Sequence, residues 1–156
     1  MRNIYRFSPI TNKDQLLEAI DYVAQQTTQL STKITGREYP IGYLTIFSHY
    51  SDEFDGLIKI VQNLGVQDGA NNGFSFLLHK PIVLLRGDLT RVRIRKPDPY
   101  RMQVGCDDFV VPDFIEFRNE FLDTHPDNLR LIKRPEHEMI EFFDPSFDVL
   151  AYVVSG

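Results

Sequence analysis

An order of elements that occurs twice is the feature of this 156-residue sequence that most restricts its fold. Between about residues 42 and 96, and again between about 104 and 155, a β-rich run is followed by an amphipathic helix and then by three short strand candidates. Repetition of a whole supersecondary unit constrains the architecture of the entire chain rather than that of one segment. The order predicts an α+β fold made of two βαβββ modules.

The first module is predicted from alternation, helical spacing and turn residues. A β-rich run at 43–49 precedes an amphipathic helix between Ser51 and Gly65. The stretch 67–73 is rich in turn-forming residues, so we expect a loop there. Three strand candidates follow at 74–79, 82–85 and 91–95, with Gly87-Asp88 in the tight turn before the last of them.

The second module repeats this order from about residue 104. A strand candidate at 104–111 leads to a helix that Asp113 and Glu116 can cap as a capping box, with phenylalanines on its buried face. Three more strand candidates follow, at 129–133, 137–143 and 149–154. The last two are separated by a turn that contains Asp144-Pro145.

A long helix at about 13–34 precedes both modules. Thr11 or Asn12 is placed to cap its first turn and Gly36 to end its last turn. Its apolar seam recurs at steps of four and three and must be buried somewhere; it comprises Leu16, Ile20, Val23, Leu30 and Ile34. We therefore divide the chain into an N-terminal helical arm at 1–41 and a main domain at 42–156, packed as one compact unit. Docking of the helix on its own sheet is the simpler solution, and exchange across a homodimer is the alternative.

Composition and charge limit the classes of function. With 42% hydrophobic and 25% charged residues the chain is typical of a globular protein, and the lone Cys106 forms no internal disulfide, which fits a reducing compartment. No apolar run is long enough to span a bilayer, and the opening residues do not form a secretion signal. The net charge of −5 argues against nucleic acid as a partner. We expect a cytoplasmic protein that binds neither nucleic acid nor membrane.

Several local segments, taken with the order of elements, point to a known family. The run 91–97 ends with a proline after its apolar residues, and the Asp144-Pro145 turn precedes the closing strand. These features resemble the vicinal oxygen chelate superfamily, which includes glyoxalases and bleomycin-resistance proteins. Ser48-His49, Asn72-Gly73 and 78–81 are most similar to its YecM-like branch. The resemblance implies that the two modules curl into one cup-shaped mixed sheet, to which the N-terminal helix is an addition.

The resemblance also implies where a metal would lie. In that superfamily a divalent ion sits in the cup, and its four ligand positions fall here on Tyr43, Arg93, Asp108 and Ala151. Arginine and alanine offer no lone pair, and neutral tyrosine is a poor ligand. Asp108 remains, joined by Glu141 if the strand at 137–143 were the closing one. We therefore expect no cofactor; a divalent metal, if one binds, would use Asp108 and Glu141.

Three arginines suggest a different chemistry for the cup. Alternation along the strand places Arg91, Arg93 and Arg95 on one face and the apolar residues between them on the other. The hypothesis is a pocket in which these guanidinium groups clamp a small carboxylate or phosphate, while Tyr43 and Asp108 shape the remainder. The alternative is a solvated face on which the arginines pair with acids of adjacent strands.

Two histidines end strand candidates in the segment where the YecM-like resemblance is densest. His49 and His79 could approach one another at the rim of the cup as an acid–base pair or as ligands. The simpler account is that each donates to a backbone carbonyl at the end of its strand.

Three readings of function follow from these residues. The first is a protein that binds a small anionic molecule, or a metal-independent enzyme, with a vicinal-oxygen-chelate fold and a degenerate metal site. The second is a divalent-metal-dependent isomerase, lyase or dioxygenase of the same superfamily. The third is an interaction module that acts through the N-terminal helix. The residues leave open whether catalysis occurs, and no catalytic residue is assigned.

Overall fold

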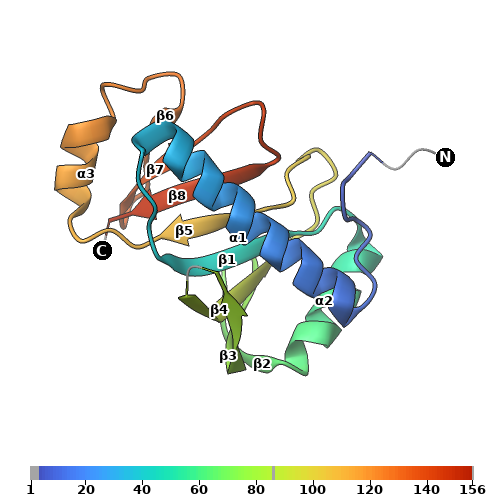
Figure 1. Ribbon diagram of the computed structural model, residues 1–156. Coiled ribbons are helices and arrows are strands. Elements are labelled where there is room, and N and C mark those ends of the chain that lie inside the picture. Colours follow the sequence, from blue (N-terminus) through green and yellow to red (C-terminus); the bar gives the residue numbers. More distant parts are fainter. Residues whose placement is uncertain (1–3, 86, 156) are drawn as a thin grey trace.

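The computed structural model describes residues 4–85 and 87–155, and its architecture is an α+β fold on one eight-stranded mixed sheet (Figure 1). The helix α1 (Lys13–Thr35) comes first in the described chain. The first module then comprises β1 (Ile41–Phe47), α2 (Ser51–Gln62), β2 (Gly65–Ala70), β3 (Gly73–Leu84) and β4 (Gly87–Arg95). The second comprises β5 (Gly105–Phe109), α3 (Phe114–Phe121), β6 (Leu129–Lys133), β7 (Glu138–Phe142) and β8 (Val149–Val154).

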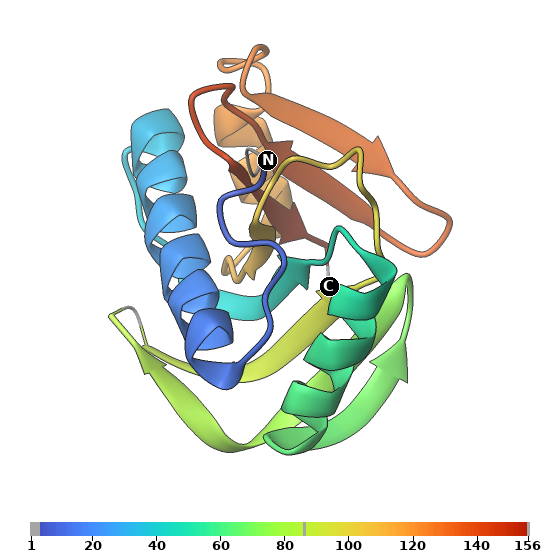
Figure 2. The ribbon, with the colours of Figure 1, turned by 90° about the vertical axis from the view of Figure 1, so that its right-hand side faces the viewer.

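The strand order confirms the prediction of two βαβββ modules. It runs β2-β3-β4-β1-β5-β8-β7-β6, so each module forms one half of the sheet and the halves meet where β1 pairs antiparallel with β5. Within each half the first strand pairs in parallel with the last, β1 with β4 and β5 with β8. The other neighbouring strands pair antiparallel. The sheet is curled and does not close into a barrel (Figure 2).

The strands of the first module differ from those predicted in two places. The expected loop at 67–73 overlaps β2, which ends at Ala70. β2 is an exposed edge strand, and its glycines weaken the sequence signal of a strand. The two candidates at 74–79 and 82–85 are one strand, β3, whose register with β4 shifts between Leu77 and Ile82, where Pro81 has no N–H to donate. Gly87 and Asp88 also begin β4 rather than forming the turn before it.

Alternation along the central strands separates an apolar face from a polar one. Leu44, Ile46, Val92 and Ile94 are fully buried or nearly so, and they pack beneath the helices in the main hydrophobic core. The residues between them on β1 and β4 point to the opposite face, because successive side chains of a strand alternate. All three helices cover the apolar face, which leaves the other face of the curled sheet uncovered by helices in the described chain.

The N-terminal helix packs on this chain's own sheet. Asn12 accepts a hydrogen bond from the Gln15 amide at the start of α1, and Gly36 ends the helix in the left-handed conformation at φ 73°. Its apolar seam is buried against β1, β5, β7 and β8. No helix in the described part of the chain is long and apolar enough to cross a membrane. The predicted domain limits at 1–41 and 42–156 include residues 1–3 and 156, which lie outside the described residues.

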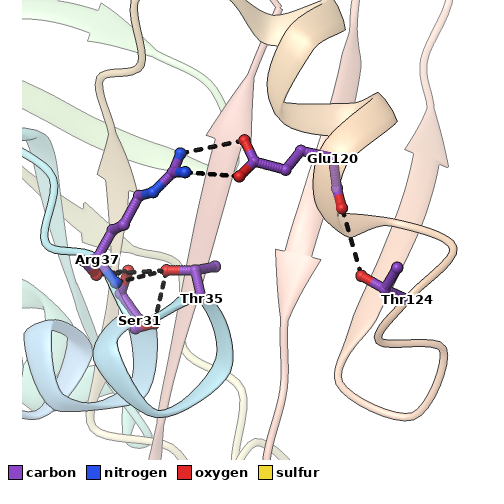
Figure 3. Close-up of polar contacts among 5 residues, drawn as sticks. All are labelled: Ser31, Thr35, Arg37, Glu120 and Thr124. Atoms are coloured by element: carbon purple, nitrogen blue, oxygen red, sulfur yellow. Dashed lines mark hydrogen bonds and ion pairs between the residues drawn. The ribbon is translucent and has the colours of Figure 1, made fainter.

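A bidentate ion pair fixes the exit of α1 to the second module (Figure 3). The guanidinium of Arg37 donates to both carboxylate oxygens of Glu120 on α3, at 3.1 and 2.6 Å. The Arg37 carbonyl also accepts hydrogen bonds from the hydroxyls of Ser31 and Thr35, so this backbone acceptor has partners where the chain leaves the helix. This arginine is engaged on the helix-covered side of the molecule and provides a comparison for the arginines of the opposite face.

Candidate functional site

The uncovered face of the sheet encloses a cavity of about 230 Å³ between its two halves. Its walls include Arg93 of β4 and Arg130 of β6, strands that are five positions apart in the sheet. In a flat sheet strands five positions apart would lie about 24 Å from each other, given a spacing of about 4.8 Å per strand. The curl of the sheet therefore brings them around one cavity, which we call the arginine cavity.

Guanidinium groups dominate the charge of the arginine cavity. Five arginines line it, namely Arg93, Arg95, Arg101, Arg130 and Arg134. Two carboxyl groups, those of Asp108 and Glu141, also line it. Because an arginine side chain stays protonated at any physiological pH, the positive charges exceed the negative ones by three even when both carboxyls are ionised. This excess stands in a chain whose net charge is −5.

Two of these arginines stack on aromatic rings of β1 instead of pairing with acids. The guanidinium of Arg93 lies 5.7 Å from the ring centroid of Tyr43, and that of Arg95 lies 4.9 Å from the ring of Phe47. Stacking orients a guanidinium by its flat face and leaves its N–H edge free to donate. Within residues 4–85 and 87–155, no ion pair is formed by Arg93, Arg95, Arg101 or Arg134.

Both carboxylate oxygens of Glu141 are already occupied. Arg130 donates to Oε1 at 3.0 Å, and the hydroxyl of Tyr152 donates to Oε2 at 3.0 Å. Glu141 is also largely buried, with an exposed fraction of 8%. Its charge is therefore compensated locally, and the carboxylate holds Arg130 and Tyr152 in place at the wall of the cavity.

Asp108 lies at the seam between the two modules. Burial raises the pKa of its carboxyl, while the nearby guanidinium of Arg93 and the imidazole of His137 act in the opposite direction. A carboxyl with a raised pKa holds its proton to a higher pH than an ordinary aspartate and, when neutral, does not repel an anion. Burial also raises the pKa of the neighbouring Cys106 thiol, with Asp108 and Asp107 adding to the effect, so Cys106 is an unsuitable nucleophile.

The residues predicted from the sequence lie in three places. Arg93, Arg95 and Asp108 line the arginine cavity. Tyr43 of β1 and Arg91 of β4 are paired on the same face, two residues before the pair formed by Thr45 and Arg93. Arg91 donates a hydrogen bond to the Tyr43 hydroxyl at 3.2 Å, and its guanidinium also lies 3.2 Å from a carboxylate oxygen of Asp68. These two residues line an adjacent cavity.

The predicted histidines lie apart from the arginine cavity. His49 is buried; because a carbonyl oxygen only accepts, its Nε2 donates to Gln103 O at 3.2 Å, and Nδ1 then accepts from the Ser8 hydroxyl at 2.6 Å. Burial lowers the pKa of this imidazole, and the Tyr5 ring stacks on it at 3.9 Å. His79 is exposed on β3, and neither histidine is among the residues that line the cavity.

Three lining arginines were not singled out from the sequence. Alternation could have placed Arg130 of β6 opposite the apolar face, since it lies between Leu129 and Leu131. Arg101 and Arg134 lie outside strands and carry no periodic signal. Their convergence depends on the curl of the sheet and on the loop after β4, which local sequence does not encode.

The residues do not fit the metal centre that the family resemblance implies. Ala151 points into the helix-covered core with no exposed surface, and the cavity position on β8 is taken by Tyr152. Arg93 places a fixed positive charge at a second ligand position, and both oxygens of Glu141 are engaged. Among the residues that the structure describes, no group of three or more His, Cys, Asp or Glu side chains is arranged to hold an ion.

Comparisons with known proteins bear on the fold. A solved structure described as "Structural Genomics, Protein EC4020" matches with a TM-score of 0.72 and 11% sequence identity, over 100% of this chain and 92% of the other. No family model matches the chain, and no curated protein matches it. At this level of identity the likeness establishes a shared α+β fold with a curled mixed sheet, and the chemistry of the cavity has to be argued from its residues.

Proposed function

We propose that this protein binds a small anionic molecule in the arginine cavity, either as a binding protein or as a metal-independent enzyme related to the vicinal oxygen chelate superfamily. The observation that carries the proposal is the excess of guanidinium groups: four of the five lining arginines form no ion pair among the described residues. Carboxylate and phosphate groups match the paired N–H donors of arginine, and such hydrogen bonds are stronger than neutral ones.

Electrostatic repulsion within the cavity favours a ligand over a purely structural role for these arginines. Like charges gathered in one cavity repel one another, and fewer screening ions and waters fit there than on an open surface. An anion placed between Arg93 and Arg95 would relieve this repulsion while accepting hydrogen bonds from both. The stacking of these two side chains on Tyr43 and Phe47 orients the donors in advance, which lowers the conformational entropy lost on binding.

Titration calorimetry with inorganic phosphate, citrate and succinate tests the proposal. We expect at least one of these anions to bind, and Arg93→Met to weaken that binding by about tenfold or more, since a hydrogen bond to a charged group contributes about 1.5–3 kcal/mol. Arg37→Met is the matched control, because it removes one arginine that is engaged with Glu120 away from the cavity. Equal affinity in the wild type and Arg93→Met, or equal losses in both variants, would contradict the proposal.

The two other functions have less support from the residues. A metal-dependent enzyme would need ligands at positions occupied by Arg93 and Ala151. Stoichiometric zinc, manganese or nickel in the purified protein, with a matching rise in melting temperature, would favour that function instead. An interaction module acting through α1 would need an exposed apolar seam, and the seam is buried on the sheet.

A further inference from the structure

A second cavity adjoins the arginine cavity. It has a volume of about 850 Å³ and shares Asp108 with the arginine cavity. Tyr43, which lines the second cavity, carries on its ring the guanidinium of Arg93, which lines the first. The two cavities therefore meet at Tyr43 and Asp108, which are direct partners in the β1–β5 pairing. Asp108 lines both cavities, and the Tyr43 ring contacts an arginine of the first.

The second cavity has a different chemical character, and we call it the apolar groove. Aliphatic and aromatic side chains make up much of its wall, namely Leu77, Val110, Val111, Phe114 and Val154. Leu77 and Val110 expose 45% and 55% of their surface. The guanidinium of Arg91 at its edge is engaged by Asp68, at 3.2 Å. Apolar groups that remain exposed beside an anion site mark a surface that gains free energy when a ligand covers it.

We propose that the ligand is amphipathic: an anionic head held by the arginines and an alkyl or aryl portion that passes over Tyr43 into the apolar groove. This inference rests on the proposed function and narrows its substrate class to organic phosphates or carboxylates with an apolar substituent. Binding sites for small molecules are commonly clefts of about 300–1,000 Å³ that combine apolar walls with a few placed polar groups. The arginine cavity alone is smaller than this range, and the groove supplies the apolar wall.

The placement of charge along the strands sets the orientation of the ligand. Arg93 and Arg95 pair with Thr45 and Phe47, toward the C-terminal end of β1. Val110 and Val154 lie on the side toward its N-terminal end. Asp108 stands between the two regions, and burial raises the pKa of its carboxyl. A protonated carboxyl there can donate to a ligand oxygen without repelling the head.

Titration calorimetry with inorganic phosphate and butyl, hexyl and octyl phosphate, each below its micellar concentration, measures the contribution of the groove. We expect affinity to rise about two- to fourfold for each added CH₂ group, which corresponds to partial or full burial of that group. Arg93→Met should weaken all four ligands by a similar factor and leave the dependence on chain length unchanged.

Two surface substitutions test the groove separately from the arginines. Val110→Asn and Leu77→Asn should reduce the gain per CH₂ to less than about 1.5-fold, because polar side chains no longer cover the chain. Both should leave the affinity for inorganic phosphate unchanged. Val66→Asn is the matched control, since Val66 is exposed to a similar extent, 59%, on the edge strand β2 and lines neither cavity.

The outcomes distinguish this inference from the proposed function. An affinity that does not depend on the length of the alkyl chain would overturn the inference of an amphipathic ligand and would still be consistent with the anion site. A dependence on chain length that persists in both Val110→Asn and Leu77→Asn would also overturn it, because the chain would then lie elsewhere. Failure of inorganic phosphate and of all three alkyl phosphates to bind would overturn this inference, and failure of citrate and succinate as well would remove the anion site itself.

Discussion

The same strands form the helix-covered face of the sheet and the uncovered, concave face that carries the arginine cavity. Two adjacent residues of β5 show that a charged group has a different environment on each face. Asp107 points toward α1 and has no exposed surface; burial raises the pKa of its carboxyl to about 8. Asp108 points into the arginine cavity, where the Arg93 guanidinium offsets part of the effect of burial. One face holds an acid that burial favours in its neutral form, and the other gathers an excess of positive charge. The comparison supports the proposal that the helix-covered face serves stability and the concave face serves binding.

The largest expected effect is on the free energy of unfolding, and it should differ between the two faces of the single strand β4. Ile94→Ala should lower the free energy of unfolding by about 2–5 kcal/mol, because it leaves a cavity under the helices. Arg93→Ala and Arg95→Ala should each lower it by about 1 kcal/mol or less. Denaturation with urea measures all three variants under the same conditions. An arginine substitution as costly as Ile94→Ala would mean that the concave face is also structural.

The next effect on stability concerns the buried carboxyl of Asp107. The Thr27 hydroxyl contacts Oδ2 of this carboxyl, and Oδ1 has no hydrogen-bond partner among the described residues. A folded-state pKa of about 8, above the usual value near 3.8, means that the unfolded chain loses its proton first as the pH rises. The stability that this group confers is complete below pH 3.8 and is lost between there and about pH 8. Asp107→Asn should therefore stabilise the protein at pH 8 by as much as about 5 kcal/mol.

Thermal melts from pH 4 to pH 8 test this prediction. The difference in melting temperature between Asp107→Asn and the wild type should grow with pH and disappear near pH 4. Asp55→Asn, at an exposed position of α2, controls for the loss of one negative charge. A constant difference at every pH would show that Asp107 is ionised throughout this range.

A smaller effect belongs to Asp108 and is seen in binding rather than in stability. Because burial raises the pKa of its carboxyl, increasing pH ionises it and adds a negative charge beside the anion. Sulfate, which does not itself titrate near neutral pH, should bind several-fold more weakly as the pH rises past the pKa of Asp108. The Asp108→Asn variant should lose most of this dependence. An identical pH profile in both proteins would remove Asp108 from the site.

The smallest effect is expected where an arginine is already paired. Arg37→Met breaks the bidentate contact with Glu120, a pair whose side chains are 55% and 39% exposed. Exposed ion pairs contribute about 0–1 kcal/mol, so the unfolding free energy should fall by no more than about 1 kcal/mol. Anion binding should not change. A loss well above 1 kcal/mol in urea denaturation would mean that anchoring the exit of α1 matters more than its exposure suggests.

The sequence predicted the order of elements well because amphipathic helices and turn residues leave local signals. It failed at β2, whose glycines and exposed polar residues are typical of a loop, and at β3, which was predicted as two strands at 74–79 and 82–85. In the site, alternation along β4 predicted that Arg93 and Arg95 share a face. The sequence could not predict that Arg101 and Arg134 join them, because their positions depend on the curl of the sheet and on loops.

The most direct test of an anion site in the arginine cavity is an anomalous diffraction experiment on crystals soaked in sodium tungstate. We expect anomalous density within the cavity, between the guanidinium groups of Arg93 and Arg95, and we expect this density to be lost in crystals of Arg93→Met. Density confined to engaged surface arginines such as Arg6 and Arg37, with an empty arginine cavity, would contradict the account.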